Sequence, residues 1–66
     1  MTQLNPQEFK RLRAELGRTQ AGMAKIVGTT GTTWYRWERG ISFPQPVFQK
    51  ELRKLQAYVA RREEGE

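Results

Sequence analysis

The segment from Thr19 to Gly40 constrains the fold of this 66-residue chain more than any other. It places the small residue Ala24 four positions before Gly28. Around these two residues lie the apolar side chains Met23, Val27, Trp34 and Trp37. Two helices that cross steeply need a small residue where their backbones meet, and a glycine where the connecting turn adopts a positive φ. The segment therefore predicts two short helices joined by a tight turn, with the apolar residues in one core.

The second helix of this pair is expected to begin after the cap residue Thr30 and to end at Gly40. At about 3.6 residues per turn, one of its sides is polar. That side carries Thr32, Tyr35, Arg36 and Arg39, and the opposite side carries Thr30, Trp34, Trp37 and Ile41. Because the apolar side must face the core, the polar side is left outward. Residues 19–40 thus have the helix-turn-helix pattern, whose second helix can enter the major groove of DNA.

Arg36 is the best candidate for reading base sequence, because its planar guanidinium can donate two hydrogen bonds to one guanine. Thr32 and Tyr35 can add hydroxyl contacts or pack against a thymine methyl group. Gly31 has no side chain and so can let the start of the helix approach the wall of the groove closely. The predicted base-reading set is Gly31, Thr32, Tyr35 and Arg36.

Thr19 is predicted to cap a helix that begins at Gln20. A phosphate site is predicted at this helix start, because free backbone N–H groups and the positive end of the helix dipole favour anions there. The predicted phosphate-binding residues are Thr19, Gln20, Lys25, Thr30, Thr33 and Arg39. Such contacts set register and affinity but carry no direct sequence information. The alternative for the charged members of this surface is that they are merely solvated.

A helix is also expected on each side of this segment. Asn5 can cap the first one, with Pro6 at its first position and Glu8 placed to reach back to the cap. Its apolar side carries Phe9, Leu12 and Leu16, and Gly17 ends it. Glu38 is predicted to form a structural ion pair with Arg13 of this helix, the alternative being a solvated carboxylate.

The last helix is expected over 46–62, opened by Pro46. Its apolar stripe consists of Phe48, Leu52, Leu55 and Val59. Phe48 and Leu52 lie nearer their own core, so the predicted homodimer contacts are Leu55, Tyr58 and Val59. The sequence therefore predicts an all-α, four-helix fold that forms a single domain over 1–66.

Composition narrows the possible functions. The chain has no Cys, His or Asp and one serine, Ser42. A zinc site or a nucleophilic triad lacks its parts, so we expect no enzyme, no metal and no cofactor. Twelve Lys and Arg against seven acidic residues give a net charge of +5, which fits a polyanionic partner. With neither a membrane span nor a signal peptide, a cytoplasmic, nucleoid-associated protein without a small-molecule effector is expected.

The segment Phe9–Gly40 resembles the phage-repressor-like helix-turn-helix family known as Cro/C1 or XRE. The residues at family positions are Thr19, Gln20, Ala24, Gly28, Arg36, Trp37, Glu38, Arg39 and Gly40. The resemblance implies that Gln20 contacts phosphate, that positions matching Gly31, Thr32 and Arg36 meet bases, and that Arg13 and Glu38 form a buried pair. The family usually has an aliphatic residue at Trp34 and a longer polar one at Gly31. Trp34 and the short C-terminal region are similar to anti-CRISPR-associated regulators, small phage proteins that repress their own operon.

Together these features predict a sequence-specific, double-stranded DNA-binding repressor that acts as a homodimer on an inverted repeat. Two-fold symmetry places the half-sites about 34 Å apart. One alternative is an antitoxin or adaptor that holds a protein partner with its C-terminal helix. Another is an RNA binder, although a helix of this kind suits the wide major groove of B-form DNA better than the narrow one of RNA.

Overall fold

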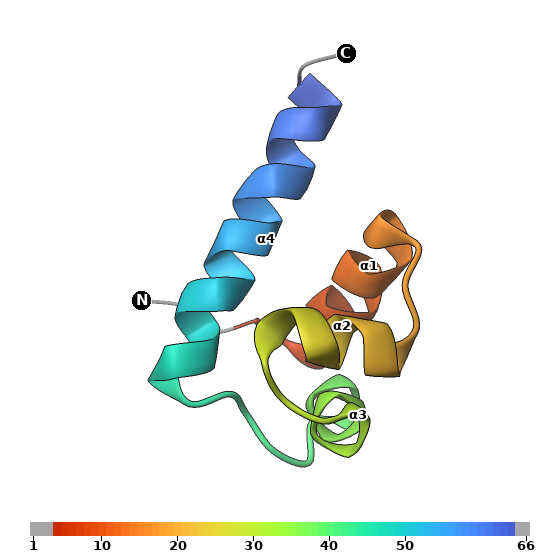
Figure 1. The fold of residues 1–66 in the computed structure, drawn as a ribbon, viewed down its shortest axis with the longest axis vertical. Coiled ribbons are helices and arrows are strands. Elements are labelled where there is room, and N and C mark those ends of the chain that lie inside the picture. Colours follow the sequence, from red (N-terminus) through yellow and green to blue (C-terminus); the bar gives the residue numbers. More distant parts are fainter. Residues whose placement is uncertain (1–3, 65–66) are drawn as a thin grey trace.

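Four α-helices make up the computed structural model, which describes residues 4–64 (Figure 1). They are α1 (Pro6–Leu16), α2 (Gln20–Val27), α3 (Gly31–Arg39) and α4 (Pro46–Glu64). No strand occurs in that range, so the all-α, four-helix prediction is confirmed. The last helix runs two residues past the expected end at 62. The predicted domain of 1–66 also includes 1–3 and 65–66, which lie outside the described residues.

The first three helices begin at the caps predicted for them. Asn5 Oδ1 accepts a hydrogen bond from the Glu8 backbone N–H at 3.0 Å, and Glu8 Oε1 accepts one from the Asn5 N–H at 2.9 Å. Thr19 and Thr30 each accept a backbone N–H from the first turn of α2 and α3. These bonds satisfy amides that have no partner within the helix, and so they fix where each helix starts.

The turn between α2 and α3 depends on Gly28, whose φ of 98° lies in the left-handed region. A side chain is strained there, whereas glycine adopts it freely. The Gly28 N–H donates to Ala24 O at 2.8 Å and closes the end of α2. The chain then reverses within three residues, and α2 and α3 pack closely together.

Aromatic rings form the centre of the core. Phe9 meets Trp34 edge to face, with ring centroids 5.5 Å apart, and Trp37 lies 5.5 Å from Trp34. Phe48 of α4 packs on Trp37 with a centroid separation of 5.6 Å. The buried apolar residues are Phe9, Leu12, Met23, Ala24, Val27, Trp34, Trp37 and Leu52. All four helices therefore meet around the two tryptophans of α3.

Two residues expected on the core side of α3 lie outside the core. Ile41 is 65% exposed, and the cap residue Thr30 is also exposed. The prediction extended the helical period to residue 41, but α3 ends at Arg39 and Gly40 turns the chain with a φ of 74°. The side chain of Ile41 is consequently no longer in phase with Trp34 and Trp37.

The long helix α4 packs mainly against α1, and its C-terminal end extends past the other helices (Figure 1). Leu52 is its one fully buried residue in the described core. Phe48, Leu55 and Val59 are partly buried, as the predicted stripe requires. Among the described residues, no helix combines the length and the apolar character needed to cross a bilayer.

Replacing Leu52 by Ala should therefore detach α4 from the core. We expect the free energy of unfolding to fall by about 2–5 kcal/mol, because the buried side chain leaves a cavity. Ile41→Ala is the matched control, and its effect should stay within about 0.5 kcal/mol because Ile41 is exposed. Urea denaturation followed by tryptophan fluorescence measures both, and equal losses would contradict the assigned core.

Candidate nucleic-acid interface

The outward side of α3 is exposed, as the sequence predicted. Thr32, Tyr35, Arg36 and Arg39 are all exposed. Trp34 and Trp37 are 0% and 2% exposed, so the two tryptophans face the core and a base-stacking role is ruled out for them in this fold. The buried tryptophans fix the rotation of α3 about its axis and thereby present Arg36 to solvent.

Two arginines on this side differ in how firmly they are held. The Arg39 guanidinium lies over the ring of Tyr35, 5.8 Å from its centroid, in a cation–π arrangement. Among residues 4–62, whose side chains the structure describes, Arg36 has no partner for a side-chain hydrogen bond or ion pair. The five donors of Arg36 are therefore free to meet a ligand, which suits a residue that reads base edges.

A hollow lies beside Arg36 and is partly lined by polar side chains that the sequence did not predict to face it. Thr29, Ser42 and Gln45 line it together with Thr33 and Arg36. Ser42 and Gln45 belong to the linker between α3 and α4, and the fold determines that their side chains border the same hollow as Arg36. No periodic pattern gives the direction of side chains in such a segment, so no sequence signal pointed to them.

Gly31 faces α2. A Cβ atom built at Gly31 would lie 3.5 Å from the Cα atom of Ala21, an ordinary contact distance. A side chain at this position would therefore begin against α2. The glycine belongs to the α2–α3 crossing, and its contribution to base reading stays a prediction.

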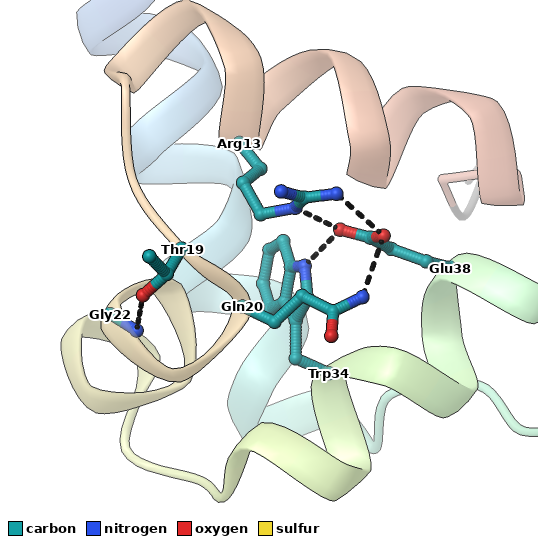
Figure 2. Close-up of polar contacts among 6 residues, drawn as sticks. All are labelled: Arg13, Thr19, Gln20, Gly22, Trp34 and Glu38. Atoms are coloured by element: carbon teal, nitrogen blue, oxygen red, sulfur yellow. Dashed lines mark hydrogen bonds and ion pairs between the residues drawn. The ribbon is translucent and has the colours of Figure 1, made fainter.

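The threonine hydroxyls at the helix starts keep donor capacity for a phosphate. Thr19 Oγ1 accepts the Gly22 N–H at 3.0 Å, which leaves its own O–H free to donate (Figure 2). The hydroxyls of Thr30 and Thr33 lie 3.1 Å apart and share one hydrogen bond. Because two hydroxyls hold two hydrogens, one O–H of this pair remains available. Lys25 is exposed on α2, and its role as a phosphate contact also stays a prediction.

Beneath the interface, the carboxylate of Glu38 joins three helices (Figure 2). Arg13 of α1 donates from Nε to Glu38 Oε2 at 2.6 Å and from Nη2 to Oε1 at 3.1 Å. The Gln20 amide donates to Oε1 at 3.0 Å, and the indole N–H of Trp34 donates to Oε2 at 2.6 Å. The predicted Arg13–Glu38 pair is thus present in the structure. The bonds from Gln20 and Trp34 were not foreseen, although Trp34 and Glu38 have the four-residue spacing of neighbours on a helix.

The protonation of Glu38 follows from these contacts. Burial alone raises the pKa of this carboxyl, since Glu38 is only 4% exposed. The hydrogen bonds from Arg13, Gln20 and Trp34 outweigh burial and hold its pKa below the ordinary value. The bond to Glu38 in turn raises the pKa of the Arg13 guanidinium. The pair is therefore fully charged at neutral pH.

This cluster changes how Gln20 can act on a phosphate. The Gln20 amide nitrogen donates one of its two hydrogens to Glu38. The nitrogen and not the oxygen of the amide must face Glu38, because an ionised carboxylate only accepts hydrogen bonds. The second hydrogen of the same nitrogen remains available as a donor. The first backbone N–H of α2 that donates within the helix belongs to Met23, which bonds to Thr19 O. The backbone N–H of Gln20 comes before it in the chain and so has no partner within the helix. Gln20 can therefore donate to an anion while it stays bound to Glu38.

The electrostatics of this surface favour an anion. Between residues 16 and 50, Glu38 is the one acidic residue, and it is buried and paired. The basic residues of the same stretch are Arg18, Lys25, Arg36, Arg39 and Lys50. Within the described part of the chain, no three residues of the His, Cys, Asp or Glu types cluster as metal ligands would. The surface around α3 therefore carries positive charge that fits a polyanion.

Comparison with protein families gives one match. A family model described as a helix-turn-helix domain covers residues 7–64, which includes all four helices apart from the first residue of α1. Searches against curated proteins and against solved structures found no match.

Replacing Glu38 by Gln should lower the free energy of unfolding at neutral pH. It should also make the remaining free energy of unfolding fall less steeply as the pH is lowered. We expect a loss of about 3 kcal/mol at pH 7, because the Arg13 charge loses its partner. The folded pKa of Glu38 lies below its unfolded value, so the stability it contributes is present at neutral pH and is lost as the pH falls below about 5. Urea unfolding at several pH values should show a flatter acid dependence for Glu38→Gln.

Glu15→Gln is the matched control for this measurement. Glu15 Oε2 lies 3.9 Å from Arg11 Nε on the exposed side of α1. An ion pair in such an exposed place contributes little to the free energy of unfolding. An unchanged acid dependence in the Glu38 variant would show that the buried carboxylate does not control stability.

Proposed function

Because the chain belongs to the helix-turn-helix domain family, of the Cro-like type, and is a DNA-binding regulatory protein, we propose that it recognises a specific double-stranded sequence and represses transcription. In this proposal α3 lies in the major groove, and Arg36 reads a guanine with help from Thr32 and Tyr35. Gly31 allows the close approach of the helix start.

The observation that carries the proposal is the free guanidinium of Arg36 on the exposed side of α3, opposite two buried tryptophans. An arginine paired with a neighbouring carboxylate would lose that partner when it binds DNA. Arg36 has no such partner among the described side chains of residues 4–62. Its side chain also borders a hollow that is partly lined by hydroxyl and amide groups, which supply further donors.

Phosphate contacts would surround this reading site. The free donors of Thr19, Gln20 and the Thr30–Thr33 pair lie at the starts of α2 and α3, where the helix dipoles add positive potential. Arg39 and Lys25 supply full charges. These groups would position α3 on the duplex, and their number would determine how strongly salt weakens binding.

A repressor of this size gains affinity by doubling its contacts, so we propose a homodimer on an inverted repeat. Leu55, Tyr58 and Val59 of α4 are its proposed contacts. Tyr58 is 56% exposed, which supports a role in association, while Leu55 and Val59 also pack on their own core. A tryptophan at position 34 is also a point of resemblance to anti-CRISPR-associated regulators. We therefore propose further that the chain is a phage protein that represses the operon encoding it.

Selection of bound sites from random duplex DNA tests the proposal directly. We expect one enriched sequence with two inverted half-sites about one helical turn apart. Arg36→Ala should then weaken binding to that sequence by about 1–3 kcal/mol and abolish the preference at one base pair of each half-site. Gel shifts on the selected and a scrambled duplex measure this, and an equal loss on both duplexes would refute base reading by Arg36.

Arg39→Ala serves as the contrasting variant. Because a phosphate contact carries no sequence information, we expect a similar loss of affinity on the selected and scrambled duplexes. The slope of log affinity against log salt should flatten by about one unit. A change of base preference with no change in this slope would instead assign Arg39 to sequence reading.

A further inference from the structure

One side of α4 carries two exposed apolar residues that no part of the described chain covers. Val47 is 64% exposed and Tyr58 is 56% exposed. They are the two large apolar residues of α4 with this degree of exposure within the described range. Tyr58 follows Val47 by eleven positions, which is about three helical turns, so both lie on the same side of the helix. The Arg62 guanidinium lies over the Tyr58 ring at 5.7 Å and still leaves the side chain more than half exposed.

Two opposite charges lie between these apolar residues on the same side. Glu51 follows Val47 by four residues, and Lys54 precedes Tyr58 by four. Residues three or four positions apart are neighbours on a helix surface. The residues of this row, which we call the α4 outer face, are Val47, Glu51, Lys54 and Tyr58. Lys54 Nζ lies 3.6 Å from Glu51 Oε2, and both side chains remain exposed.

We propose that the α4 outer face binds the same face of a second copy in antiparallel orientation. Val47 then packs against the partner's Tyr58, and Glu51 pairs with the partner's Lys54. Two-fold symmetry repeats each contact, so four charges meet at the centre with an apolar contact at either end. This inference rests on the proposed homodimer and specifies its interface. It keeps Tyr58 as a contact, and it replaces Leu55 and Val59, which pack on their own core, by Val47, Glu51 and Lys54.

A single register produces both kinds of contact. In an antiparallel pair, position numbers rise along one helix while they fall along the other. If Val47 faces the partner's Tyr58, the residue four positions after Val47 therefore faces the residue four positions before Tyr58 in the partner. Those residues are Glu51 and Lys54, which carry opposite charges. The charge pattern is thus complementary to itself in the register that the apolar residues select.

A parallel pair would lack this complementarity. In that arrangement each residue faces its own copy, so Glu51 would meet Glu51 of the partner subunit and Lys54 would meet the partner's Lys54. Like charges that face each other are unfavourable and are a common means by which helix pairs exclude an orientation. The antiparallel orientation is therefore the one that the α4 outer face favours.

The antiparallel orientation also fits two DNA half-sites. In Figure 1, α3 lies toward the N-terminal end of α4, while the C-terminal end of α4 points away from it. Antiparallel pairing therefore puts the two copies of α3 toward opposite ends of the paired helices. An inverted repeat needs two reading helices that are separated in this way.

Charge-reversed variants test the interface in the absence of DNA. Glu51→Lys places four lysines at the centre of the pair, and Lys54→Glu places four glutamates there. We expect each variant to raise the dimer dissociation constant about tenfold relative to the wild type, because attraction becomes repulsion at two symmetric positions. Sedimentation equilibrium measures these constants, at protein concentrations up to several hundred micromolar, since the interface is small.

An equimolar mixture of the two variants gives the decisive result. In the mixed dimer every lysine faces a glutamate of the other chain, so we expect association to return to within about threefold of the wild-type value. A change that merely damaged the fold of α4 would not be repaired by mixing. Arg53→Glu is the control for Lys54→Glu, because it makes the same charge change off the α4 outer face.

Three results would overturn the inference: a wild-type chain that stays monomeric over this range, single variants that associate like the wild type, or a mixture no tighter than its components. Far-UV circular dichroism verifies that each variant keeps its helices. Because these measurements contain no DNA, a negative result would not contradict sequence-specific DNA binding. The selection of bound sites and the Arg36→Ala variant test that binding separately. Failure of DNA recognition likewise leaves the antiparallel interface to be judged by the mixture.

Discussion

The buried carboxylate of Glu38 is the interaction on which the arrangement of α1, α2 and α3 depends. An unpaired carboxylate in a core of aromatic rings would be strongly unfavourable, so its donors must all be in place when the chain folds. Those donors come from three different helices, namely Arg13, Gln20 and Trp34. The requirement links the crossing of α2 and α3 to the position of α1. A more apolar core would pack as well, but it would not require these three side chains to converge on one point.

The same cluster connects stability to DNA binding. Trp34 and Glu38 lie on the inner side of α3, and their contacts fix how that helix is rotated. Arg36 on the opposite side is exposed for that reason. Gln20 belongs to both regions, since its amide binds Glu38 while its backbone begins α2, where a phosphate is expected. The charge of Glu38 is neutralised by Arg13, so an acidic residue can support the recognition helix without repelling DNA.

The exposed charges around α3 differ from those on α4. Around α3 the exposed charges are basic, which suits a polyanion. On α4 the charges of Glu51 and Lys54 alternate with the exposed apolar residues Val47 and Tyr58, which suits a surface of the same composition. In the proposed dimer, the exposed side of α4 supplies a second surface that is distinct from the one around α3.

The sequence by itself determined the helices, their caps and the inward rotation of α3, because these depend on local hydrogen bonds and on apolar spacing within one helix. Asn5, Thr19 and Gly28 illustrate this, since each acts on residues within a few positions of itself. The predicted burial of Ile41 was wrong because helical periodicity says nothing about a residue after the helix has ended. Only the tertiary structure decided that Gln20 reaches Glu38 and that the linker residues Ser42 and Gln45 border Arg36. The Gln20–Glu38 contact joins residues 18 positions apart, and its geometry is set by how whole helices pack. The linker is close to Arg36 in the chain, but it follows no helical period, so the directions of its side chains are set by the fold.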